Sequence, residues 1–139
     1  MNEKEIDIVR NRMRDKHCGD EKQLEVVFSS QKRLLVEAPA GYGKTNTMVS
    51  RIAYLIAVGQ IPVPKRLLAL TFSVNAAYKI KKDISGNIPQ LLYGLSHQVS
   101  IKDKIYVSNY HGFCRSVLKK YGRLIHPALA ELDILQSID

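Results

Sequence analysis

The stretch EAPAGYGKTNT, residues 37–47, places two glycines, a lysine and a threonine directly after an apolar run. Gly41 and Gly43 let the backbone turn tightly with its amides facing inward, and the N-terminus of a helix beginning at Lys44 favours negative charge. The lysine can reach the terminal phosphates of a nucleotide, and the hydroxyl of Thr45 can bind Mg²⁺. We therefore expect a phosphate-binding loop with Lys44 and Thr45 as catalytic candidates.

The predicted nucleotide contacts extend along the whole loop: Ala38, Pro39, Ala40, Gly41, Tyr42, Gly43, Lys44, Thr45 and Asn46. The stretch departs from the pattern G-x-x-x-x-G-K-[ST] at its first position, where Ala38 replaces glycine. An ordinary glycine turn capping a helix is the alternative, although such a turn needs neither the lysine nor the threonine. A dinucleotide-binding loop fits less well because the third glycine is missing.

Strand-like and helix-like segments alternate around this loop, which favours an α/β fold with a parallel sheet flanked by helices. In the segment 87–103 we expect at most a short helix, after Asn87 and Pro89. The strands are expected over 33–39, 66–72 and 104–110, and the helices over 2–18, over 45–58, from a cap at Asn75 to Gly86, and after 110 with Phe113, Val117, Leu118 and Tyr121 on one face.

The chain has 139 residues, enough for one domain or part of one, and a formal net charge of +8. This excess of Lys and Arg favours a polyanionic partner without proving one. No apolar run reaches the roughly 18 residues of a membrane span and no secretory signal is visible, so we expect a cytoplasmic location and no membrane partner. Cys18 and Cys114 are expected to be free thiols.

Four stretches in order resemble the motifs of the superfamily 1 DNA helicases of the UvrD/Rep type. DEKQLEVVF resembles the Q motif, with Gln23 lying 21 positions before Lys44, and APAGYGKT resembles motif I. LLALTFSVNAAYKIKKDI is similar to motif Ia, and VSNYHGFCRSVLKKYG to motif Ib. The ending LDILQSID is similar to the segment that leads into the inserted 1B subdomain.

This resemblance implies a RecA-like P-loop NTPase fold that binds ATP and Mg²⁺ and contacts single-stranded DNA, with RNA left open. Residues 1–18 would be a helical extension, and 19–139 the N-terminal part of the ATP-binding domain 1A, ending at the start of 1B. The remaining partners would be 1B and a second motor domain. We expect the chain to be the N-terminal piece of an enzyme that moves 3′ to 5′ along DNA.

The resemblance also assigns roles outside the loop. Gln23 would read the adenine edge, since its amide both donates and accepts; a solvated helix position is the alternative. The candidate nucleic-acid contacts are Phe72, Ser73, Asn75, Tyr110 and His111. Phe72 would stack on a base or else pack in the core. A metal site on His111 and Cys114 lacks further ligands.

Several positions depart from the family pattern, and some of them lie where relatives contact DNA. Ser73, Val74 and Asn75 replace the usual Thr-Asn-Lys, and Lys79 replaces a glutamate. Seven basic residues give the two motif helices a basic exterior, most of which we assign to solvent: Lys79, Lys81, Lys82, Arg115, Lys119, Lys120 and Arg123.

The sequence lacks parts that hydrolysis needs. No D-E-x-x run follows an apolar strand, and no arginine-finger motif is found, so we expect little ATPase activity from the chain alone. The alternatives are a truncated, non-catalytic nucleotide- or nucleic-acid-binding module that works with a partner, and a small-molecule kinase. A kinase has the same loop but does not account for the Q, Ia and Ib matches.

Overall fold

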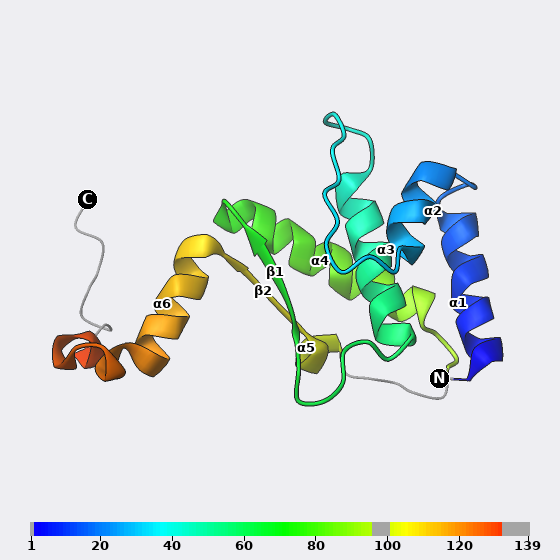
Figure 1. The fold of residues 1–139 in the computed structure, drawn as a ribbon. Helices are drawn as coiled ribbons and strands as arrows, with labels where there is room; N and C mark the ends of the chain where they lie inside the picture. The colour runs from blue at the N-terminus through cyan, green and yellow to red at the C-terminus, as the bar shows by residue number, and fades with distance from the viewer. Residues whose placement is uncertain (1, 96–100, 132–139) are drawn as a thin grey trace.

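The computed structural model describes residues 2–95 and 101–131 as a mixed α/β fold (Figure 1). Helices α1, α2 and α3 form a group on one side, α4 runs from this group to the sheet, and α6 leads away from it. The elements are α1 (Glu3–Lys16), α2 (Glu21–Phe28), α3 (Lys44–Ala57), β1 (Leu67–Thr71), α4 (Val74–Leu91), α5 (Ile101–Lys104), β2 (Ile105–Asn109), α6 (Tyr110–Tyr121) and the 3-10 turns η1 (Gly122–Leu124) and η2 (Pro127–Glu131).

Strands β1 and β2 pair in parallel, with Leu67 opposite Ile105 and Thr71 opposite Asn109. α4 joins the β1 end to the rest of the chain and packs on the sheet, chiefly on β2. Alternate residues of a strand point to opposite faces, and here Ala69 and Val107 are buried while Leu68 is exposed. One face of this two-stranded sheet is therefore covered. The strands predicted over 66–72 and 104–110 and the helix predicted after them are confirmed, although each strand is one residue shorter than predicted at either end.

Helix α3 lies at the centre of the core, in contact with α1, α2 and α4. Val49 and Ala53 of α3 are fully buried, as are Val9 and Met13 of α1 and Ile88 of α4. Spacings of three and four residues put these side chains on inward-facing stripes of their helices. Burial of a Val, Ile or Met side chain contributes about 1.5–3 kcal/mol to stability, so the N-terminal helix is a part of the core.

Polar side chains fix where the helices begin and end. Asn2 forms a capping box with Glu5 at the start of α1. The side chain of Asp20 caps α2 by accepting a hydrogen bond from the backbone amide of Gln23. At the C-terminal end of α4, Arg12 donates hydrogen bonds to the carbonyl oxygens of Leu91 at 3.0 Å and of Tyr93 at 2.7 Å.

The prediction of a strand over 33–39 is wrong. These residues form no strand, and the side chains of Leu34, Leu35 and Val36 are 43%, 84% and 42% exposed. A strand requires a neighbour that pairs with its N–H and C=O groups. Among the described residues only β1 and β2 pair, so this segment is not part of the sheet.

The predicted bounds of α4 are also wrong at both ends. Ser73, and not Asn75, caps the helix, by accepting a hydrogen bond from the amide of Ala76 at 3.1 Å. The helix continues through Gly86 and Pro89 to Leu91. Glycine inside a helix costs about 1 kcal/mol, which burial of large side chains such as Ile88 and Leu91 offsets.

Other sequence expectations concern the cysteines, the membrane and the chain end. Cys18 and Cys114 are free thiols, as predicted, and both are exposed. Among the described residues, no helix combines the length and the apolar character needed to cross a bilayer. The ending that resembles the start of 1B, 132–139, and the segment 96–100 lie outside the described residues.

The ammonium group of Lys16 is buried without a hydrogen-bond partner. Burial lowers the pKa of Lys16 below its ordinary 10.5, and the nearby Asp83 only partly opposes this. Because the unfolded chain then binds more protons between the folded pKa and 10.5, stability rises with pH across that interval.

Lys16→Met keeps the apolar stem and removes the buried charge, so we expect a higher melting temperature than wild type at pH 7. The advantage should shrink as the pH rises through the lowered pKa of Lys16 towards 10.5, because the folded wild-type protein then no longer carries the buried charge. Thermal unfolding of both proteins at pH 7, 9 and 10 measures this. A variant no more stable than wild type at pH 7 would contradict the desolvation argument.

Two helical glycines form a matched pair. A Cβ at Gly112 would lie 2.7 Å from Asn109 Oδ1 and 2.9 Å from Ser108 Oγ, whereas a Cβ at Gly86 meets no atom within 4 Å. Gly112→Ala therefore displaces the Asn109 cap of α6 and should cost about 0.5–2 kcal/mol. Gly86→Ala should stabilise by about 0.5–1 kcal/mol. Urea unfolding measures both, and the same sign for both would refute this reading.

Candidate functional site

The loop before α3 has the backbone that the motif predicts. Gly41 and Gly43 have φ angles of +85° and +72°, in the left-handed region that side chains with a Cβ adopt at a cost. Gly43 is the N-cap of α3, and the helix begins at Lys44. The expected turn between residue 37 and the helix is therefore present, although the segment that precedes it is not a strand.

The first turn of α3 exposes backbone donors. The first backbone hydrogen bond into the helix runs from the amide of Thr47 to Gly43 O at 2.9 Å, so the amides of Lys44, Thr45 and Asn46 have no acceptor earlier in the helix. No side chain caps this end either. Unpaired amides and the positive end of the helix dipole together make a site that favours an anion.

Lys44 folds back over its own loop. Its Nζ donates to the carbonyl oxygens of Ala38 and, at 2.6 Å, of Pro39. The side chain is exposed, and neutral carbonyls are its only hydrogen-bond partners in the described chain. An ammonium gains more from a charged acceptor than from a neutral one, so a phosphate group would displace these carbonyls.

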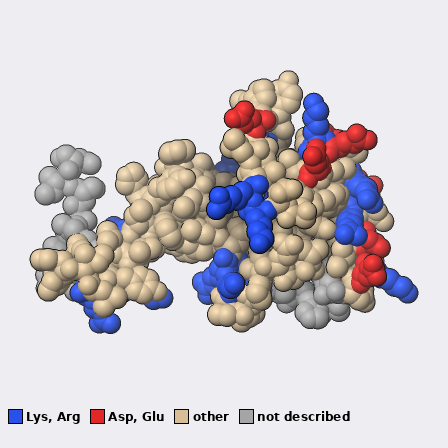
Figure 2. All heavy atoms as spheres, viewed as in Figure 1, with Lys and Arg blue, Asp and Glu red and all other residues tan. Residues whose placement is uncertain are grey.

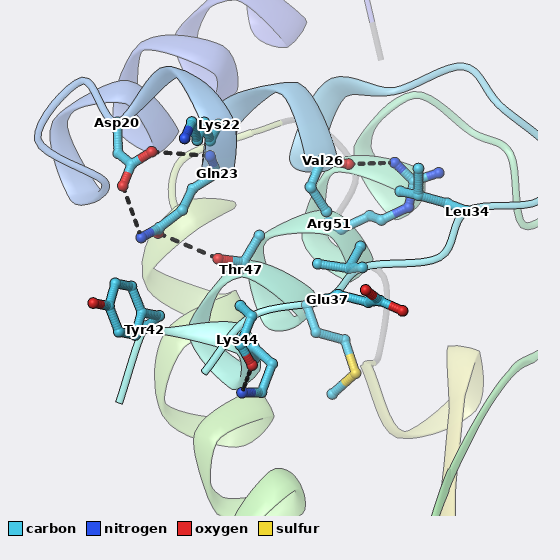
Figure 3. Close-up of a pocket in the computed structure, with 13 residues that line it drawn as sticks. Asp20, Lys22, Gln23, Val26, Leu34, Glu37, Tyr42, Lys44, Thr47 and Arg51 are labelled. Carbon is cyan, nitrogen blue, oxygen red and sulfur yellow. Dashed lines mark hydrogen bonds between the residues drawn. The ribbon is translucent and has the colours of Figure 1, made fainter. Parts of the chain in front are cut away.

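A cavity of about 510 Å³ adjoins the loop (Figure 3). Residues of α2, of the segment 34–38, of the loop and of α3 line it, among them Gln23, Tyr42, Lys44, Thr47 and Arg51. Its size falls in the range of about 300–1,000 Å³ found for small-ligand sites. The cavity thus brings together the predicted base reader and the predicted phosphate lysine.

Gln23 is bound to its neighbours by both ends of its amide. Nε2 donates to Asp20 Oδ2 at 3.1 Å, and Oε1 lies 2.6 Å from Nδ1 of His17 and 3.2 Å from Thr47 Oγ1. Its amide also lies against Gly43, since a Cβ there would be 3.4 Å from Nε2. Gln23 is half-buried and belongs to a hydrogen-bond network. This environment differs from a solvated helix position, which was the alternative for this residue.

Two residues of this region were missed from the sequence. His17 is only 5% exposed and its Nε2 lies 2.8 Å from Ser50 Oγ on α3. Arg51 donates to the carbonyls of Val26 at 2.5 Å and of Ser29 at 3.1 Å, and so ties the end of α2 to α3. The sequence does carry one signal of such a network: Ser50 is a polar residue on the buried stripe of its helix.

The predicted nucleic-acid residues form a second cluster, where both strands end. Phe72 follows β1 and Tyr110 follows β2, and their rings lie 5.3 Å apart at an angle of 46°. Phe72 is 90% exposed and Tyr110 is 46% exposed. The alternative of core packing for Phe72 therefore does not hold in the described chain, and the two aromatic side chains form an exposed pair.

The other three candidates lie at the starts of the helices that follow these strands. The hydroxyl of Ser73 caps α4, while Asn75 in its first turn and His111 in the first turn of α6 are exposed. No group of three or more metal-ligating side chains occurs within 2–95 and 101–131. None of the five nucleic-acid candidates lines the cavity beside the phosphate loop, so the two sites use separate residues.

The basic side chains of α4, α6 and η1 are exposed, as expected. On the face drawn in Figure 2, Lys and Arg occur in separate groups and do not form one continuous band. Arg12 and Arg51 bind carbonyls at helix ends, so part of the basic excess has a structural role. The lysines nearest Phe72 and Tyr110 remain candidates for contacts with a polyanion.

The family model described as the UvrD/REP helicase N-terminal domain matches residues 19–139. The chain belongs to this family. The resemblance drawn from the four motifs is thereby confirmed, and the matched residues include both the phosphate loop and the aromatic pair.

Curated relatives are each named as one subunit of an ATP-dependent helicase/nuclease. The protein of Bacillus velezensis is 34% identical over 110 residues, which cover 74% of this chain and 9% of the relative. That of Bacillus licheniformis is 36% identical over 112 residues, with the same coverage. That of Clostridioides difficile is 35% identical over 104 residues, which cover 70% of this chain and 8% of the relative. The matched part of the chain thus spans less than a tenth of the length of each of these relatives.

Proposed function

We propose that this chain is the ATP-binding N-terminal part of a RecA-like motor domain in an ATP-dependent DNA helicase or translocase. The observation that carries the proposal is the N-terminus of α3, where unpaired amides, a glycine turn and Lys44 converge beside the cavity. The names of the relatives support ATP use and a DNA-processing role.

In this proposal the loop backbone from Ala38 to Asn46 holds the phosphates. Lys44 exchanges its carbonyl partners for the β- and γ-phosphates, and the half-buried hydroxyl of Thr45 helps to hold Mg²⁺. The donor set fits this ligand, since amides, an ammonium and a hydroxyl are what a Mg²⁺-bound triphosphate requires. When bound, Mg²⁺ would neutralise part of the phosphate charge. At the other end of the nucleotide, Gln23 would face the base.

Phe72 and Tyr110 give single-stranded DNA a surface on which to stack, which is the sequence-independent contact that a translocase requires. Ser73, Asn75 and His111 lie beside them as candidates for backbone contacts. In the whole enzyme, 1B and a second motor domain would complete the cleft, and the 3′-to-5′ direction is taken from the family resemblance. Residues 1–18 extend the ATP-binding domain.

A truncated, non-catalytic binding module is the second candidate. The sequence supplies one Asp-Glu pair, Asp20 and Glu21, which precedes the loop rather than following a later strand. Such a module binds nucleotide or nucleic acid, and under both proposals the 139-residue chain hydrolyses little ATP. Hydrolysis that rises with single-stranded DNA when the chain is part of a longer protein distinguishes the enzyme from the module.

Lys44→Ala should weaken ATP–Mg²⁺ binding at least about tenfold, because it removes a charged contact worth about 1.5–3 kcal/mol. The melting temperature should not change, because Lys44 is exposed and, among the described residues, its side chain hydrogen-bonds only to its own loop. Calorimetric titration measures the affinity, and Lys4→Ala, an exposed lysine of α1, is the matched control. Equal affinity in Lys44→Ala and wild type would remove the phosphate-loop assignment.

Phe72→Ala should reduce the affinity for a labelled single-stranded oligonucleotide between about fivefold and a hundredfold, since stacking contributes about 1–3 kcal/mol per base. Tyr93→Ala is the control, because Tyr93 is 77% exposed but follows the far end of the 18-residue α4. Fluorescence anisotropy with DNA and with RNA also compares the two substrates. Equal losses in both variants would count against the aromatic pair as the binding surface.

A further inference from the structure

Helix α6 carries an apolar stripe that faces solvent. Cys114, Val117 and Tyr121 of α6 and Leu124 of η1 follow one another at intervals of three, four and three positions. Cys114 is exposed, and Val117, Tyr121 and Leu124 are 38%, 48% and 77% exposed. Within the part of the chain that the structure describes, no residue of α6 is buried. We call these four residues the α6 seam.

The described chain leaves the α6 seam open. Helix α6 contacts β1, β2 and the two 3-10 turns, and it leads away from the group formed by α1, α2 and α3 (Figure 1). The ring of Phe113 lies 6.4 Å from that of Tyr106 on β2, so the helix meets the sheet at Phe113. A contiguous apolar surface in contact with water marks a place where another segment packs.

The spacing of the α6 seam indicates what kind of segment that is. Apolar residues at alternating intervals of three and four positions form the line along which one α-helix packs on another. A strand would instead need a partner with unpaired backbone N–H and C=O groups, and the backbone groups inside a helix are already bonded to each other. The α6 seam therefore fits a second helix.

The charges beside the α6 seam indicate the composition of that helix. Residues 110–124 contain no Asp or Glu, and their basic residues are Arg115, Lys119, Lys120 and Arg123. Lys120 Nζ lies 5.2 Å from the centroid of the Tyr121 ring, at the edge of the seam. Glutamates that flank an apolar stripe would pair with these cations, whereas a second copy of this chain would bring like charges together.

We propose that the α6 seam is the surface on which the rest of the motor protein packs, through an amphipathic helix with acidic residues beside its apolar stripe. This rests on the proposed function, in which the chain is one part of a longer enzyme. The relatives support it, because the match covers less than a tenth of each of them. Single-stranded DNA fits less well, since it would neutralise the basic side chains and leave the apolar stripe in water.

The test uses two labelled helical peptides of about three heptads, both with leucine at positions a and d, one with Glu and the other with Lys at e and g. The 139-residue chain should bind the Glu peptide at least about fivefold more tightly, with a difference that shrinks in salt. Val117→Asp should weaken this binding at least about tenfold. Ser116→Asp, which adds the same charge at an exposed residue outside the seam, should not.

The two exposed cysteines give a second measurement. Cys114 lies in the α6 seam, and Cys18 lies just after α1. Saturation with the Glu peptide should slow the reaction of Cys114 with a maleimide at least about tenfold and leave that of Cys18 unchanged. In a longer protein that contains this chain, Cys114 should react slowly without any peptide.

Three results would overturn the inference: equal binding of the two peptides, sedimentation of the chain as a dimer that Val117→Asp dissociates, or protection of Cys114 by a single-stranded oligonucleotide and not by the Glu peptide. Fast labelling of Cys114 in the longer protein would also overturn it. Val117→Asp should leave ATP–Mg²⁺ affinity unchanged, because the residues that line the cavity do not include any of α6. Failure of wild type to bind ATP–Mg²⁺ would instead overturn the proposed function.

Discussion

The burial of α3 is the constraint on which the rest of the structure depends. Its side chains pack against α1, α2 and α4, and residues such as Val49, Ala53 and Ala57 have almost no exposed surface. In an α-helix only the amides of the first turn lack an intrahelical acceptor, so α3 can present backbone donors to a ligand only at its N-terminus. The same packing that stabilises the core therefore also fixes the direction of the helix dipole and the position of the glycine turn that precedes it.

The features that were predictable from the sequence are those determined by local chemistry. A glycine pair before a Lys-Thr helix start needs left-handed backbone, and Gly41 and Gly43 adopt it. The helical stripe of α3 and the two paired strands follow from the spacing of apolar residues. Exposure of Phe72 was left open by the sequence, since a strand end can face either the core or solvent.

The features that were not predictable depend on tertiary partners. The apolar run that contains Leu35 has the composition of a strand, yet strand formation requires pairing with a neighbour, and among the described residues only β1 and β2 pair. Gly86 was expected to end a helix, but burial on both sides of it decides otherwise. His17 and Ser50 lie 33 positions apart, and only the packing of α1 on α3 brings them together.

The spacing of the two exposed rings limits what they can hold. Phe72 and Tyr110 extend from neighbouring parallel strands, and their centroids are 5.3 Å apart. A flat group inserted between two rings needs roughly twice the ~3.5–4.0 Å of a van der Waals contact, which exceeds this gap. The pair is therefore a platform and not a clamp: a planar ligand can lie on its outer side and leave sideways, without any parting of the strands beneath.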